Sequence, residues 1–147
     1  MKHKMIYPIV LIPIIVGLFT QVMKFLLSIV NHRKVEMKYL FTSGHMPSSH
    51  TSFVVSLATL VALSDSIYST TFAISFVFAF IVIHDAIRIR MNIGENGKIV
   101  NKLIKEVPGI NKENYPILRE RVGHKPLEVL GGGIFGFFLT LLLVQFF

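Results

Sequence analysis

The chain contains no cysteine among its 147 residues. This absence excludes disulfide scaffolds, thiolate metal sites and cysteine nucleophiles, although it does not identify the compartment. The sequence also lacks internal repeats and low-complexity tracts. At this length we expect a single domain over residues 1–147.

Acidic residues are scarce, with 8 Asp and Glu against 15 Lys and Arg, and the net charge is +7. Such a charge can indicate nucleic-acid binding. However, 52% of the residues are apolar and Phe alone occurs 13 times, which is more apolar surface than a soluble domain of this size can bury. Basic residues also gather in the cytoplasmic loops of membrane proteins. We therefore predict an integral protein of the cell membrane, with no nucleic-acid partner.

Four apolar stretches and one polar segment organise the chain. The stretches are long enough, or nearly long enough, to cross a bilayer, and the first has no signal-peptide cleavage site, so we expect it to be retained. Periodic apolar residues at the start of the polar segment predict an amphipathic helix near the cytoplasmic membrane surface. The expected fold is all-α, a polytopic transmembrane helical bundle of about four spans. The spans lie near 7–27, 48–64, 69–84 and 127–147, and the polar loop covers 85–126.

Two local signals refine this pattern. Pro108 and Gly109 are expected to end the amphipathic helix. Gly132 and Gly136 have the four-residue spacing that permits close contact with another helix in lipid.

The distribution of basic residues predicts the topology. With four spans, the side that holds both termini and the Ser64 turn carries only Lys2 and Lys4. The other side carries the remaining 15 − 2 = 13 Lys and Arg, if Lys24 at its border is included. This asymmetry places the long polar loops in the cytoplasm.

Polar side chains from four separate segments converge on that cytoplasmic face. One ionisable residue at a helix end often only reaches the interface, but several meeting at one level favour a phosphate-handling site. These residues are Lys24; Ser48, Ser49 and His50; His84, Asp85, Arg88 and Arg90; and His124 and Glu128.

Two histidines have the settings of catalytic groups. His50 follows Pro-Ser-Ser at a helix start, where free amides favour an anion and an imidazole could protonate a departing oxygen. The alternative is a residue that only caps its own helix. His124 and Glu128 lie about one turn apart on one helix face, so the carboxylate could orient the imidazole for attack. The same spacing suits a metal, with His84 and Asp85 nearby.

Cations around these histidines suit a phosphate, because the guanidinium fork matches two of its oxygens. We expect Asp85 to pair with Arg88 and orient it. The candidate cations are Lys24, Arg88, Arg90, Arg119 and Arg121.

The motifs resemble the type 2 phosphatidic acid phosphatase superfamily, which includes the vanadium haloperoxidases. Pro47-Ser48-Ser49-His50 resembles its Pro-Ser-Gly-His motif, and His124 followed by Glu128 resembles its third motif, with Glu in place of Asp. The chain looks most like the small divergent branch of this superfamily over nearly its full length. The further matching positions are Lys24-Phe25, Asp85 with Arg88, Gly94, Asn101, and Gly123 with Pro126.

The resemblance implies a mechanism and a substrate class. His124 would attack phosphorus to give a phosphohistidine, Glu128 would orient it, and His50 would protonate the leaving alcohol. Lys24 and arginines would hold the phosphate without metal or cofactor. The sequence departs from the parent motifs at two positions. Leu118 stands where the third motif has arginine, with Arg119 one position later, and Ser49 replaces the glycine of the Pro-Ser-Gly-His motif.

We therefore predict a phosphatase of membrane lipid phosphomonoesters or diphosphates, expected to act as a homodimer because the implied core has more helices than one chain supplies. Two alternatives stay open. One is a non-catalytic protein that binds or transports phospholipid headgroups, and the other is a metal-dependent membrane hydrolase. In the favoured scheme each site residue has a role: catalytic His124, His50 and Glu128; phosphate-binding Lys24, Ser48, Ser49, Arg88 and Arg119; and supporting Asp85, Arg90 and Asn101.

Overall fold

A computed structural model describes residues 6–30, 46–108, 115–120 and 122–147. Within these ranges all regular structure is helical, which confirms the predicted all-α bundle. The α-helices are α1 (Ile6–Val30), α2 (Ser49–Ser64), α3 (Thr70–His84), α4 (Arg90–Glu106) and α5 (Pro126–Leu143). A π-helical segment (Asp85–Ile89) joins α3 to α4, and a short 3-10 turn (Val144–Phe146) follows α5.

Three helical stretches are long and apolar enough to cross a membrane: Ile9–Val30, Thr70–Glu106 and Pro126–Phe146. Helix α2 is also apolar but has only 16 residues. Large side chains such as Ile74, Phe76 and Phe80 are more than half exposed, as expected of a surface that faces lipid. The chain is an integral membrane protein.

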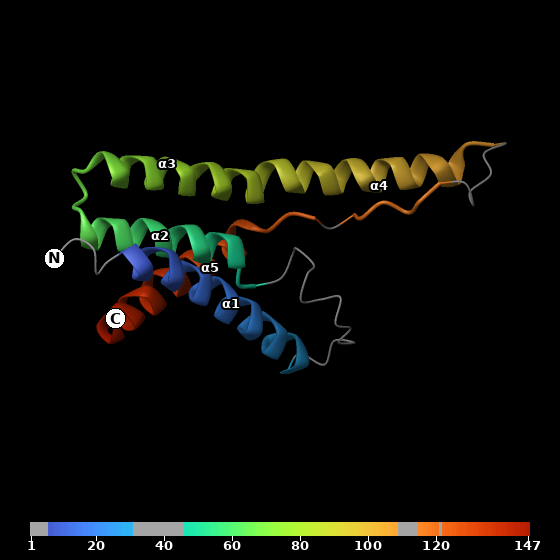
Figure 1. Ribbon diagram of the computed structural model, residues 1–147. Coiled ribbons are helices and arrows are strands. Elements are labelled where there is room, and N and C mark those ends of the chain that lie inside the picture. The colour runs from blue at the N-terminus through green and yellow to red at the C-terminus, as the bar shows by residue number, and fades with distance from the viewer. Residues whose placement is uncertain (1–5, 31–45, 109–114, 121) are drawn as a thin grey trace.

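Helix α2 is the centre of the bundle and packs against α1, α3 and α5 (Figure 1). Lipid gives helices no hydrophobic reason to associate, so close approach depends on small residues and interhelical hydrogen bonds. The Ser52 hydroxyl donates to the Gly132 carbonyl at 2.8 Å, and that of Thr140 donates to Ser56 Oγ at 2.7 Å. The predicted close contact at Gly132 and Gly136 is therefore present, and its partner is α2.

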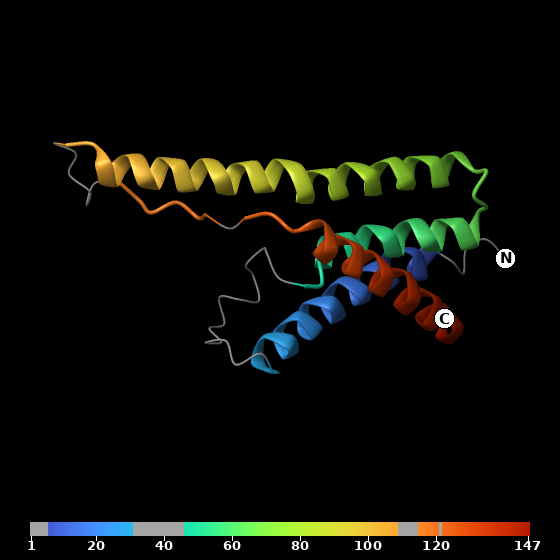
Figure 2. The ribbon, with the colours of Figure 1, turned by 180° about the vertical axis from the view of Figure 1, so that it is seen from behind.

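The predicted amphipathic helix is present as α4, but it does not lie against the bundle as a separate surface element. Helices α3 and α4 form one continuous helix of 37 residues from Thr70 to Glu106. At 1.5 Å per residue this helix is about 55 Å long, well beyond the ~30 Å core of a bilayer. Helix α4 consequently projects past the ends of the other helices (Figures 1 and 2). It ends at Glu106, just before Pro108, as predicted.

An extended segment runs back along α4 from Tyr115 to α5 (Figure 2). Glycines on α4 let it approach closely, because a Cβ at Gly94 would lie 2.7 Å from the Glu120 carbonyl oxygen. The amide of Asn101 donates to the Leu118 carbonyl and accepts from the Leu118 N–H, both at 2.9 Å. The Asn101 side chain thus makes the same pair of hydrogen bonds to Leu118 that the backbone of a neighbouring β-strand would make. The extended segment then leads to His124.

Candidate functional site

His124 and Glu128 form a buried pair at the start of α5. The Nδ1 atom of His124 lies 3.1 Å from Oε2 of Glu128, and the two residues are only 3% and 8% exposed. Glu128 also accepts a 3.2 Å hydrogen bond from the Lys125 N–H. Its carboxylate therefore caps α5 and orients the His124 ring at the same time. The Nδ1 contact leaves Nε2 as the nitrogen that could act on a ligand.

The backbone anchors this pair to two other helices. The His124 N–H donates to the Ala86 carbonyl at 3.1 Å, and the Ser48 N–H donates to the Glu128 carbonyl at 3.2 Å. The start of α5 is therefore held between the π-helical segment that follows α3 and the start of α2. Burial lowers the pKa of the His124 imidazole; the Glu128 hydrogen bond and charge oppose this shift, while Lys24 and Arg90 add to it. His124 is consequently favoured as the neutral imidazole.

Lys24 brings a positive charge to the same place from α1. It is only 7% exposed, and its charge interacts with Glu128 and with His124. A buried ammonium requires an oppositely charged neighbour, because an unpaired charge is costly to remove from water. Helix α1 continues beyond Lys24 to Val30, so the lysine lies inside the bundle and not at a helix end.

His50 stands at the first turn of α2, facing the same group of charges. The fields of Arg90, His124, Lys24 and Asp85 all act on its ring. Unlike His124 it is exposed, so its ring can exchange protons with water. The structure thus brings together six predicted site residues from four parts of the chain, namely α1, the start of α2, the junction of α3 with α4, and the start of α5. These residues are Lys24, His50, Asp85, Arg90, His124 and Glu128.

The predicted pairing of Asp85 with Arg88 is wrong, because Asp85 pairs with Arg90. The Arg90 Nε donates to Asp85 Oδ2 at 2.7 Å. In an α-helix the partner would lie three or four residues away, but here the Arg90 N–H bonds to the Asp85 carbonyl across a π-turn. The wider turn moves the fifth residue over Asp85 and leaves Arg88 exposed.

Three predicted site residues, the phosphate-binding Ser48 and Arg119 and the supporting Asn101, make structural contacts of their own. The buried Ser48 hydroxyl accepts from the Thr51 N–H and hydroxyl, which makes it the cap of α2. Arg119 lies beside Gly97, whose added Cβ would meet the Arg119 carbonyl at 2.7 Å. Gly97 is about 16 Å along the helix axis from Ala86, the neighbour of His124. Asn101 lies farther still and holds the extended segment; Arg121 falls outside the described residues.

Ser49 remains at the site as the first residue of α2. It is partly buried, and the first amides of a helix lack partners within the helix. Together with His50 it presents backbone donors where an anion is favoured.

The ligand set of the metal alternative is not assembled. His84 is exposed and stacks on Phe80 with ring centroids 6.3 Å apart, while Asp85 is engaged by Arg90. Across residues 6–30, 46–108, 115–120 and 122–147, no three His, Cys, Asp or Glu side chains are grouped as metal ligands. His124 and Glu128 are a two-residue pair that faces cations.

Sequence reasoning did not recognise what Gly94 and Gly97 do. Both are buried against the extended segment, and Gly123 similarly packs on Met91, where an added Cβ would meet backbone at 2.5 Å. The available signal was a face of Gly94, Gly97 and Asn101 on a helix whose other faces carry charged and large apolar residues. Such a row of small residues indicates a closely packed partner.

Comparison with known proteins identifies the family of the chain. Residues 6–139 match the family described as "Divergent PAP2 family". The chain is 38% identical over 141 residues to "Uncharacterized membrane protein YuiD" of Bacillus subtilis (strain 168), covering 88% of this chain and 89% of that protein. No solved structure matches the chain. The family match contains every segment that supplies Lys24, His50, Asp85, His124 and Glu128, and the chain belongs to the divergent PAP2 family.

Proposed function

We propose that this protein is a phosphatase of membrane lipids that carry a phosphomonoester or diphosphate, and that it acts through a phosphohistidine on His124. The observation that carries the proposal is the buried His124–Glu128 pair beside Lys24. A neutral imidazole held by a carboxylate through Nδ1 has the form of an activated nitrogen nucleophile. The neighbouring ammonium supplies the charge that a phosphate requires.

The phosphate is held by charge from one side and by a helix start from the other. Lys24 lies in the interior of the bundle, while Arg90 is oriented by Asp85. The first amides of α2, at Ser49 and His50, contribute N–H donors at the positive end of the helix dipole. These groups stabilise the extra negative charge on the phosphoryl oxygens in the transition state.

The reaction proceeds in two displacements. In the first, Nε2 of His124 attacks phosphorus, the bond to the lipid oxygen breaks, and His50 transfers its proton to the departing oxygen. In the second, neutral His50 takes a proton from water, the hydroxide oxygen attacks phosphorus, and the N–P bond breaks. Inorganic phosphate leaves and His124 regains its electron pair. One water is consumed for each lipid alcohol released from a phosphomonoester, or for each lipid monophosphate released from a diphosphate.

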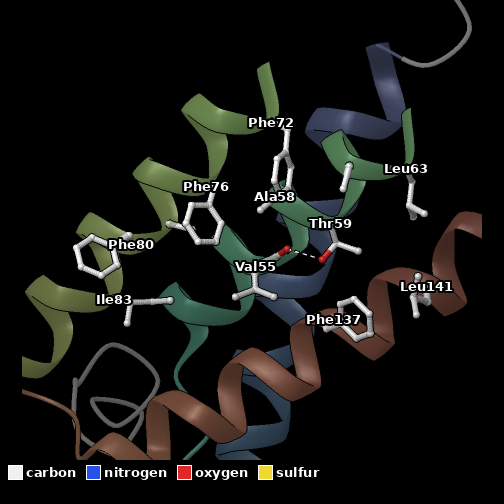
Figure 3. A pocket seen from close by; sticks show the side chains of 12 residues that line it. Val55, Ala58, Thr59, Leu63, Phe72, Phe76, Phe80, Ile83, Phe137 and Leu141 are labelled. Atoms are coloured by element: carbon white, nitrogen blue, oxygen red, sulfur yellow. Dashed lines mark hydrogen bonds between the residues drawn. The ribbon is translucent and has the colours of Figure 1, made fainter. Parts of the chain in front are cut away.

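Apolar hollows beside the site favour a lipid over a soluble phosphate ester. One hollow of about 540 Å³ is lined at one end by Thr51, which follows His50, and by Pro126, two residues after His124. It shares Val55, Ile83 and Phe137 with a second hollow of about 470 Å³ (Figure 3). In Figure 3 the phenyl rings of α3 face α2 and α5 across this space, which is lined almost entirely by carbon. A hydrocarbon chain fits such a lining, with its phosphorylated end at the histidines.

The decisive experiment uses the purified full chain in lipid nanodiscs. Phosphatidate, a prenyl phosphate and a prenyl diphosphate are offered, and phosphate release is measured. We expect turnover that disappears in His124→Ala and persists in His84→Ala, a matched control because His84 is exposed and stacks on Phe80. Rapid quenching with labelled substrate should trap acid-labile, alkali-stable phosphate on the wild type and on His84→Ala, but not on His124→Ala.

Other outcomes separate the rival functions. Binding of lipid phosphate without turnover by the wild type would show a headgroup-binding protein. Turnover that survives in His124→Ala, or that a chelator removes, would overturn the phosphohistidine mechanism. Orthovanadate should inhibit, because its trigonal-bipyramidal form resembles the transition state at His124.

A further inference from the structure

Helix α4 extends beyond the other helices of the bundle (Figures 1 and 2). Its charged residues cannot lie in hydrocarbon, and among the described helices it packs mainly against its own π-helical junction. Because α4 continues the axis of α3, it points away from the membrane and does not rest on it (Figures 1 and 2). The charged residues are Arg90, Glu95, Lys98, Lys102, Lys105 and Glu106.

One face of α4 is already covered by the extended segment. Gly94, Gly97 and Asn101 are buried beneath it. At 100° per residue these three positions share one side of the helix.

A second face, about 110° around the helix from the first, is apolar and uncovered. We call it the α4 seam. Its members on α4 are Ile93, Asn96, Val100 and Leu103, and the row continues to Ile89 in the π-helical segment and to Val107 just past the end of α4. The five apolar members are 39–52% exposed: Ile89 51%, Ile93 52%, Val100 39%, Leu103 52% and Val107 42%. Large apolar side chains do not normally form a continuous row in water unless something covers them.

The spacing of the α4 seam identifies what covers it. Successive members are separated by four, three, four, three and four residues, which is the heptad pattern of a coiled coil. In that register Ile93, Val100 and Val107 occupy a positions, and Ile89, Asn96 and Leu103 occupy d positions. β-Branched residues at a with leucine at d favour two parallel strands.

Membrane topology imposes the same orientation. Two copies inserted in one membrane have parallel α3 helices, so their α4 helices emerge from the same face and run in the same direction. A two-fold axis along the membrane normal then brings each α4 seam against its own copy. Asn96 would meet the Asn96 of the second copy at a d position, where the two side-chain amides can hydrogen-bond across the seam. Confinement to the bilayer raises the effective concentration, so a short coil suffices.

We infer that the α4 helices of two copies form a parallel coiled coil through the α4 seam, and that the protein is a homodimer joined outside the membrane. Ile99, which is 58% exposed, and Ile104 flank the seam and extend its apolar contact. The inference does not depend on the proposed hydrolysis, because it rests on the pattern and exposure of α4 alone.

The absence of cysteine makes a direct test possible. Val100→Cys and Leu103→Cys place a thiol in the α4 seam, whereas Lys98→Cys and Lys105→Cys place one on the charged faces of the same helix. In native membranes under mild oxidation, the seam variants should form disulfide dimers at least about tenfold faster, because in-register seam positions hold the two sulfurs near bonding range. Equal rates at seam and charged positions would overturn the coiled coil.

A second measurement guards against variants that fail to fold. Val100→Asp adds a charge to a side chain that is exposed in the single chain, so its helix content should match that of Lys98→Asp. Mass measurement in nanodiscs should give a monomer for Val100→Asp and a dimer for Lys98→Asp and the wild type. A monomeric wild type would overturn the proposal. A fluorophore attached at position 100 gives a further check. If it inserts into lipid vesicles of mixed charge while the seam cysteines form no disulfide, the membrane surface covers the seam and the proposal is overturned.

Discussion

The carboxylate of Asp85 accepts a 2.7 Å hydrogen bond from the guanidinium of Arg90, five residues further along the helix. The π-turn between them makes this contact possible, because an α-helical register would bring residues three or four apart into line. The ion pair with Asp85 fixes Arg90 near His50 and His124, and the charge of Arg90 acts on both imidazole rings. A π-turn at the end of a membrane span thus selects which of two nearby arginines belongs to the site.

Replacing Arg90 should therefore harm the reaction more than replacing Arg88. In Arg90→Ala, the loss of a charge-assisted hydrogen bond of about 1.5–3 kcal/mol and of a cation beside the phosphate should lower kcat/KM at least about tenfold. Arg88→Ala, which removes an exposed arginine from the same turn, should stay within about threefold. Initial rates on a lipid phosphate measure both. Equal losses would contradict the selection of Arg90 by the π-turn.

The positions of the helices were predictable because hydropathy and helix-start chemistry act locally. Ser48 caps α2 as its sequence context indicated, and Pro126 begins α5. The convergence of Lys24, His50 and His124 followed from topology alone, since spans of similar length return their ends to one membrane face. The identity of the family rested on the same residues.

The errors concern relationships that no periodic pattern encodes. A π-turn adds a residue to one helical turn, and nothing in the segment around Asp85 distinguishes it from an α-helix with Arg88 as partner. Likewise the apolar period of α4 specifies an amphipathic helix but not its direction, which depends on whether the helix breaks after His84. Because it does not break, Arg119 is carried away from the site along with the extended segment.

The contact between α2 and α5 should not tolerate an added methyl group at Gly136. A Cβ there would lie 2.5 Å from the Ser52 carbonyl oxygen, which is backbone and cannot move without shifting α2. Gly136→Ala should lower stability by about 1–3 kcal/mol, as overpacking does. Gly133→Ala is the matched control, because its Cβ would meet only side-chain atoms at 3.8 Å. Thermal unfolding in detergent compares the two, and an equal Tm would contradict the close packing.

The extended segment should detach from α4 when Asn101 is replaced. Asn101→Leu removes both hydrogen bonds to Leu118 and leaves that backbone unpaired, at a cost of about 1–3 kcal/mol. Limited proteolysis should then cut between Tyr115 and Glu120 faster than in the wild type. Asn92→Leu changes an exposed asparagine on the same helix and should leave the cleavage rate unchanged. Unaltered cleavage in Asn101→Leu would show that other contacts hold the segment.

The histidine face of the bundle should be cytoplasmic, because the basic residues gather there. Single cysteines at Tyr68, which is 92% exposed in the turn between α2 and α3, and at Lys98 on α4 report the two sides. A membrane-impermeant maleimide should label Tyr68→Cys in intact cells and Lys98→Cys only after lysis. The reverse pattern would invert the orientation while leaving the site intact.

The acid limit of activity should follow the His124 imidazole. Because burial lowers its pKa from 6.5, neutral His124 persists below that pH, and kcat/KM should fall only as the medium becomes more acidic than pH 6.5. The Glu128 hydrogen bond and charge raise this pKa, so Glu128→Gln, which removes the charge, should lower it further. The acid limb of the Glu128→Gln profile should therefore move to lower pH, while the plateau rate falls because the ring is a weaker nucleophile and less well oriented. Glu120→Gln, on the exposed extended segment, should leave the limb in place. A Glu128→Gln limb that moves to higher pH, or an unchanged plateau, would mean that another group limits the reaction and that the His124–Glu128 pair serves only to cap α5.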